Sequence, residues 1–159
     1  MSSKTLGNLM RVCVISIAIC GLFLCLYVIP HWGKSIITSY PEFSSWFWPW
    51  LIFAWLVALP CFAVLVLVWR IAGAVLNETV FTLLTAKWMK MVSVLLLTDA
   101  GILFSGNIIY LFLRMNHPSV VIFSMMGDIF IVALALFAAA LSRYITKASI
   151  LQEETDGLV

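Results

Sequence analysis

The hydrophobic pattern of the chain consists of four long apolar stretches separated by short polar segments. Each stretch is about twenty residues long, which is the length that an α-helix needs to cross a hydrocarbon layer about 30 Å thick. The pattern therefore predicts four membrane-spanning helices, at about 9–28, 50–68, 91–113 and 120–141. We expect the first span to stop at Pro30 and the second to be kinked at Pro60, because proline lacks a backbone N–H and disturbs the preceding helical turn.

The composition supports the same class of protein. Of the 159 residues, 64% are hydrophobic and only 10% are charged, and a water-soluble domain of this size would have to expose much of that apolar surface. We therefore predict an all-α integral membrane protein, a single four-helix bundle over residues 1–159 that lies in a lipid bilayer. The net charge of +2 is too small to indicate direct binding of nucleic acid. The first apolar run is too long for the core of a signal peptide.

The distribution of lysine and arginine predicts the orientation in the membrane. Most of these residues lie before span one, between spans two and three, or after span four: Lys4, Arg11, Arg70, Lys87, Lys90, Arg143 and Lys147. Only Lys34 and Arg114 lie on the other side. Because cytoplasmic segments are enriched in these cations, we expect both termini in the cytoplasm. The short tail at residues 148–159, ASILQEETDGLV, would then be cytoplasmic too.

The connection between spans two and three carries the pattern of a helix start. Residues 77–79 interrupt the apolar run, and Thr82 then suits the N-cap of the third helix. Phe81, directly before it, would pack against the first turn near Ala86. Lys87 and Lys90 would lie at the cytoplasmic end of that helix. We therefore expect this connection to form part of the cytoplasmic face.

The outer loop between spans one and two is rich in aromatic residues: Trp32, Tyr40, Phe43, Trp46, Phe47, Trp48 and Trp50. Rings of this kind are typical of the interface between membrane and water. They would also suit an aromatic site for an external lipid or peptide. The pattern favours the interfacial belt and leaves the second interpretation open.

Two acidic residues, Asp99 and Asp128, lie inside predicted spans. An acid costs about 2.5–3.5 kcal/mol near the bilayer centre, so such residues usually face protein or water. Helical spacing places Asp99 on one face with Asn107, and Asp128 on a stripe of small and polar residues. We expect both acids to point into the bundle, several ångströms apart in depth, with Thr98, Ser105 and Asn107 as hydrogen-bond partners.

Three interpretations of these acids stay open. With Asn107 they form a candidate intramembrane polar site. The two acids are structural, protonated groups that hydrogen-bond to neighbours, or they line a ligand-sensing cavity, or they form a proton-coupled transport site. Transport is disfavoured because the spans contain no basic partner for them and span one contains no glutamate.

No pattern in the chain indicates an enzyme, a cofactor or a metal site. The four cysteines, Cys13, Cys20, Cys25 and Cys61, form neither a Cys-x-x-Cys pair nor a metal-ligand spacing. We interpret them as small hydrophobic residues in helix packing. The nucleophile elbow, the His-Glu-x-x-His motif and the glycine-rich phosphate loop are missing too. We therefore expect a non-enzymatic protein without a cofactor or a metal.

Short stretches of the chain resemble a known family. They are VFT at the start of span three, HPS in the turn before span four, and LQEETDGLV at the end. In these stretches the chain is similar to the bacterial domain of unknown function 2975, at Phe81, Thr82, Leu151, Glu153, Glu154, Asp156 and Val159. It departs from that family at residues 77–79, where a glycine is usual, and at residues 157–158, where a threonine is usual.

The resemblance implies a four-span membrane protein whose gene often lies beside that of a small helix-turn-helix regulator. It suggests a regulatory or sensor protein of the bacterial inner membrane that binds such a regulator. The candidate docking residues are Phe81, Thr82, Lys87, Lys90, Leu151, Glu153, Glu154, Asp156 and Val159. The acids would supply electrostatic complementarity, and Leu151, Leu158 and Val159 would supply apolar anchors.

Two alternatives to this docking hypothesis stay open. The acidic tail could simply solvate the end of the fourth helix. The chain could also be a small proton-coupled transporter, or an export-associated protein, that uses Asp99 and Asp128. The sequence likewise leaves self-association into a homo-oligomer open.

Overall fold

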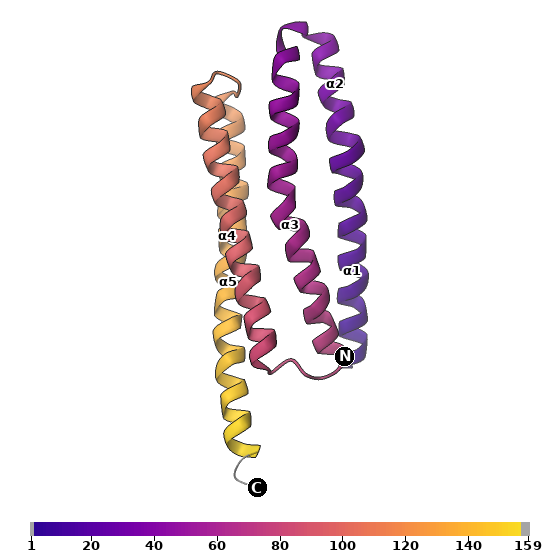
Figure 1. Ribbon diagram of the computed structural model, residues 1–159, viewed down its shortest axis with the longest axis vertical. Helices are drawn as coiled ribbons and strands as arrows, with labels where there is room; N and C mark the ends of the chain where they lie inside the picture. The colour runs from indigo at the N-terminus through magenta and orange to yellow at the C-terminus, as the bar shows by residue number, and fades with distance from the viewer. Residues whose placement is uncertain (1, 157–159) are drawn as a thin grey trace.

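The computed structural model describes residues 2–156, and every regular element within that range is helical. In chain order the elements are α1 (Ser3–Phe23), the π-helical turn η1 (Leu24–Val28), α2 (Ile29–Ser39), the 3-10 segment η2 (Pro41–Trp46), α3 (Phe47–Leu76), α4 (Leu83–Phe112) and α5 (Pro118–Asp156). Figure 1 shows the long helices lying side by side.

Four helical stretches are long and apolar enough to cross a membrane: Ser3–Ser39, Pro41–Leu76, Leu83–Phe112 and Pro118–Thr155. Each overlaps one of the predicted spans, which confirms the prediction of an all-α chain with four helices suited to a membrane. Large apolar side chains lie exposed on the outer faces of these helices, for example Phe123 at 78% and Leu26 at 68%. Such faces suit contact with lipid tails.

The four long helices pack in sequence order, so that the bundle is an open row. α1 packs against α3, α3 against α4, and α4 against α5; within the described range no Cα atom of α1 comes within 8 Å of one in α5. The Tyr110 hydroxyl of α4 donates to the Pro49 carbonyl of α3 at 2.8 Å. The Ser142 hydroxyl of α5 donates to the Ala86 carbonyl of α4 at 2.7 Å. These two hydrogen bonds show which residues lie opposite one another in the antiparallel pairs α3–α4 and α4–α5. This register positions the candidate sites.

The first helix does not end at Pro30, contrary to our expectation. Pro30 is the second residue of α2, which follows α1 and η1 without a break. The chain passes the proline because η1 is wider than an α-helix: the Ile29 N–H donates to the carbonyl of Leu24, five residues back. The same pattern would pair the Cys25 carbonyl with residue 30, which has no N–H. The indole N–H of Trp55 in α3 donates to that carbonyl instead, at 3.0 Å.

The second long helix contains its proline as expected. α3 includes Pro60, and Figure 1 shows this helix changing direction partway along its length. Such a bend is typical of an internal proline, which removes one hydrogen bond of the helix and crowds the turn before it.

The start of α4 confirms Thr82 as its N-cap. The Thr82 hydroxyl oxygen accepts the N–H of Thr85 at 3.3 Å, and the Thr82 backbone is extended. In the connection before it, Glu78 has a positive φ of 58°, a left-handed conformation that glycine adopts more easily. Glu78 lies among residues 77–79, where the family that the chain resembles usually has a glycine.

Candidate functional site

Helix α5 extends well past the rest of the bundle at the end where α1 begins. Ser142 lies opposite Ala86, so the antiparallel register places residue 145 level with the start of α4 at Leu83. From there α5 continues to Asp156, which is about 16 Å further at about 1.5 Å per residue. Figure 1 shows this end of α5, in yellow, beyond the connection between α3 and α4. We call residues 150–156 the α5 extension.

The α5 extension contains most of the acidic tail that the sequence singled out. Leu151 is 62% exposed, and Glu153 and Glu154 are exposed as well. The backbone is helical as far as Asp156, so these side chains are displayed along one continuous helix. The side chain of Asp156 and all of Val159 lie outside the part of the chain that the structure describes, and the predictions for them stay predictions.

The candidate docking residues at the start of α4 lie at a different level from the extension. Phe81, Lys87 and Lys90 are exposed, and Thr82 is half-buried. The register places residues 81–90 beside residues 138–147 of α5 and not beside the acids further along. Exposed cations gather at this level on both helices: Lys87, Lys90, Arg143 and Lys147. We call these four residues the cation belt.

Asp99 is almost completely buried, at 1% exposed. The Cys61 thiol of α3 donates to its Oδ2 at 3.2 Å, while its Oδ1 has no hydrogen-bond partner among the described residues. The expectation that Asp99 faces the protein is confirmed, but its expected partners are not those observed. Thr98 and Ser105 donate to carbonyls of their own helix, and Asn107 bonds elsewhere in α4 and in the turn after it.

Cys61 is the residue of this site that we did not expect, because we interpreted it only as a packing residue. The sequence does contain a signal for the contact between Cys61 and Asp99. The connection between α3 and α4 is short, at residues 77–82, so the two helices run antiparallel. Counting outward by equal steps from the middle of that connection brings residue 60 opposite residue 99, which places Cys61 directly beside Asp99.

Asp128 lines a groove of about 430 Å³ between α4 and α5. The other walls of the groove are apolar, with Phe104 from α4 and Met125 from α5 among them. Asp128 is only 8% exposed, yet neither of its carboxyl oxygens has a hydrogen-bond partner among the described residues. Because a buried polar group without a partner is costly, this is a place where a proton, a water molecule or a cationic ligand would be stabilised.

The two aspartates lie at nearly the same level in the bundle. The register set by Ser142 and Ala86 places residue 128 opposite residue 100, so the offset from Asp99 is one residue, or about 1.5 Å. Our expectation of several ångströms in depth is therefore wrong. The physical reason is the short turn between α4 and α5, which pairs residues that lie equally far from it.

A comparison with known families identifies the family of this chain. The family described as "Protein of unknown function (DUF2975)" matches residues 33–159. The chain belongs to the DUF2975 family. No curated protein and no solved structure matches it.

The DUF2975 match includes both groups of candidate residues, because it begins within α2 and continues past the described end of α5. It confirms the resemblance to this family, and its range includes Phe81, Thr82 and the acidic tail. Helix α1 lies outside the matched range. The DUF2975 description names no activity.

Proposed function

We propose that this DUF2975 protein is a non-enzymatic, multi-pass protein of the bacterial inner membrane that docks a small cytoplasmic protein through the α5 extension. The partner we infer is a small, basic helix-turn-helix regulator, as the family resemblance suggests. In this proposal both termini lie in the cytoplasm. Binding at the membrane would hold the regulator away from DNA, which makes the protein a regulatory or sensor partner.

The observation that carries this proposal is the acidic helix end that extends beyond the bundle. Glu153 and Glu154 lie in the last turns of α5, where the negative end of the helix dipole disfavours carboxylates. Ile150 and Leu151 are 46% and 62% exposed in the same region. A basic partner with an apolar groove would compensate both features, because opposite charges speed the encounter and an apolar helix face fits a groove.

The cation belt supports the proposed orientation. Its lysines and arginines are exposed at the level where α4 begins, and cations at the end of a span are typical of the cytoplasmic side. The anionic lipid surface on that side attracts cations and repels carboxylates. The belt would therefore lie at the headgroups, while the acidic α5 extension would point away from the membrane and stay available to a partner.

Removing the charge of the extension is expected to slow docking. In the double variant Glu153→Gln, Glu154→Gln, the association rate with the purified regulator should fall about tenfold at low salt and depend less on salt, because electrostatic steering is lost. In Leu151→Ala the dissociation rate should instead rise about tenfold, because an apolar anchor is removed. Both rates can be measured by biolayer interferometry with the full chain in lipid nanodiscs.

The matched control for the charge variant is Glu42→Gln. Glu42 is an exposed acid in η2, at the opposite end of the bundle, and its loss should leave both rates unchanged. If the regulator does not bind the wild-type chain, or binds the extension variants as it binds the wild type, the docking proposal is wrong. The extension would then only solvate the end of α5.

A second candidate function, proton-coupled transport or export, is favoured by the unpartnered carboxyl group of Asp128 in its groove. Asp99 lies at the same level and would be the second acid of such a site. If Asp99→Asn with Asp128→Asn reproduces the phenotype of a gene deletion, while removal of residues 151–159 has no effect, transport replaces docking. The opposite pattern supports docking.

A further inference from the structure

A cavity of about 490 Å³ lies among α1, α3 and α4, at the end of the bundle where α4 begins. The residues that give it its chemistry are Arg11, Trp69, Arg70, Thr82, Thr85 and Trp88. In the sequence, Arg11 and Arg70 contribute only to the distribution of lysine and arginine that predicts the orientation in the membrane. The packing of three helices brings them together around one hollow.

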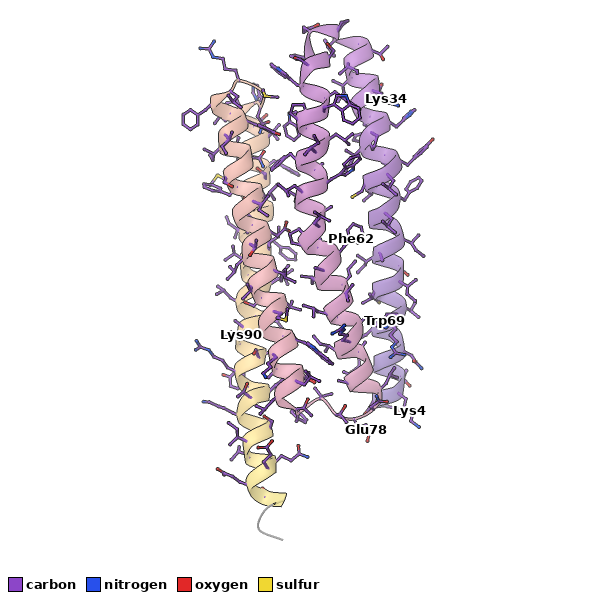
Figure 2. All side chains as sticks on the ribbon, viewed as in Figure 1. Lys4, Lys34, Phe62, Trp69, Glu78 and Lys90 are labelled. Carbon is purple, nitrogen blue, oxygen red and sulfur yellow. The ribbon has the colours of Figure 1, made fainter. Side chains whose placement is uncertain are left out.

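Arg11 is held against α3 by an aromatic ring and a glycine. Its guanidinium carbon lies 4.9 Å from the centroid of the Trp69 ring, a cation–π geometry, and Figure 2 shows Trp69 between α3 and α1. A β-carbon at Gly73 would lie 3.2 Å from a terminal nitrogen of Arg11, so this glycine makes room for the guanidinium group. The Nε of Arg11 is buried and has no hydrogen-bond partner among the described residues.

Arg70 provides a second guanidinium group in the same cavity. Its guanidinium carbon lies 6.0 Å from the centroid of the Trp88 ring in α4. Among the described residues, no acid lines the cavity. Glu78, the acid nearest to Arg70 in the sequence, is exposed on the connection between α3 and α4 (Figure 2). Two positive groups thus lie at a hollow without a compensating negative charge.

The first turn of α4 adds to the positive character of the cavity. Thr82 and Thr85 line it, and the N-terminus of a helix carries a partial positive charge that favours anions. The Thr82 cap occupies one N–H of this turn, and the two guanidinium groups add charged donors to the cavity.

We propose that this cavity binds a phosphate-bearing anion. The planar fork of a guanidinium group matches the oxygens of a phosphate group with paired hydrogen bonds, and the two indole rings line the same cavity. The volume suits a small organic phosphate better than a bare ion, because pockets for small ligands measure about 300–1,000 Å³. The cavity lies at the level of the cation belt, so a lipid headgroup and a soluble phosphate ester both have access to it. This site does not depend on the docking proposal.

Thermal unfolding of the full chain in detergent tests the site with two probes. They are dihexanoyl phosphatidylglycerol, for a lipid headgroup, and sn-glycerol 3-phosphate, for a soluble phosphate ester. We expect the Tm to rise with probe concentration, since a ligand that binds only the folded state stabilises it. A response to the lipid probe alone assigns the site to a headgroup, whereas a response to both shows that the phosphate ester suffices. In Arg11→Gln and Arg70→Gln the fitted Kd should be at least tenfold weaker.

Arg143→Gln is the matched control, because Arg143 is an exposed arginine of the cation belt that does not line the cavity. It should keep the Kd of the wild type. Arg70→Lys keeps the positive charge but loses the planar guanidinium group, so it should bind the probes with an intermediate Kd. If a glutamine variant does not fold, Arg70→Lys is the variant that tests the site. A wild-type Tm that responds to neither probe, or an Arg70→Lys variant that binds as tightly as Arg143→Gln, overturns the proposal.

Discussion

Replacing Gly106 with alanine is expected to lower the free energy of unfolding by about 1–3 kcal/mol, the usual cost of adding a carbon to a packed interior. Gly106 lies in α4 opposite Phe53 of α3, and a β-carbon at this position would overlap the Phe53 ring. The change can be measured by titrating the chain in mixed micelles with sodium dodecyl sulfate and following its circular dichroism.

The Phe53 ring cannot easily move aside, which is why we expect a large effect. Phe53 is only 8% exposed, and it packs edge-on against Tyr110 at a centroid distance of 5.2 Å and against Trp50 at 6.0 Å. Tyr110 is itself fixed by its hydrogen bond to the Pro49 carbonyl. The added carbon would therefore push α3 and α4 apart at the level of this aromatic cluster.

Gly101→Ala is the matched control for this prediction. Gly101 lies on the same helix, but nothing lies within 4 Å of a β-carbon at that position. Since alanine favours the helix over glycine by about 0.5–1 kcal/mol, this variant should be as stable as the wild type or slightly more so. Equal destabilisation by the two substitutions would contradict the contact between α3 and α4 described above.

The second large effect is expected for Trp55→Phe, which should cost about 1–3 kcal/mol because it leaves the Cys25 carbonyl without a donor. That carbonyl belongs to η1, and its helical partner would be Pro30, which has no N–H. No water is available in a bilayer core to replace the indole, so the penalty cannot be avoided there. The same micelle titration measures it.

A double-mutant cycle separates this hydrogen bond from the packing of the indole ring. In a Pro30→Ala background residue 30 regains its N–H, so Trp55→Phe should cost clearly less than in the wild type. Trp48→Phe is the control, because Trp48 is 62% exposed and should tolerate the change. If the cost of Trp55→Phe is the same in both backgrounds, the explanation for how the helix passes Pro30 is wrong.

The features that were predictable from the sequence depend on local pattern. Four apolar stretches of sufficient length predict four helices for a membrane, and the Thr82 cap follows from the preference of a threonine side chain for a free N–H in the first turn. The burial of Asp99 and Asp128 follows from the cost of exposing an acid to lipid. The exposure of Leu151, Glu153 and Glu154 is also in line with their polar surroundings in the sequence.

The features that we did not predict depend on the register between helices. The Cys61 thiol reaches Asp99, and Trp55 reaches Cys25, only because antiparallel neighbours bring distant residues to one level. The cavity between Arg11 and Arg70 needs three helices at once, so no single stretch of sequence carries its pattern. The continuation of the first helix past Pro30 likewise requires a donor from another helix.

The proposed docking function depends most directly on the side of the membrane that the α5 extension faces, and labelling of single cysteines measures this. The native cysteines are replaced, with Cys61→Ser to keep a donor for Asp99, and Gln152→Cys is introduced in the exposed extension. Glu42→Cys reports the opposite end of the bundle. We expect a membrane-impermeant maleimide to label Glu42→Cys in intact spheroplasts, and Gln152→Cys only after the membrane is disrupted. Labelling of Gln152→Cys in intact spheroplasts would contradict a cytoplasmic docking helix and with it the proposed function.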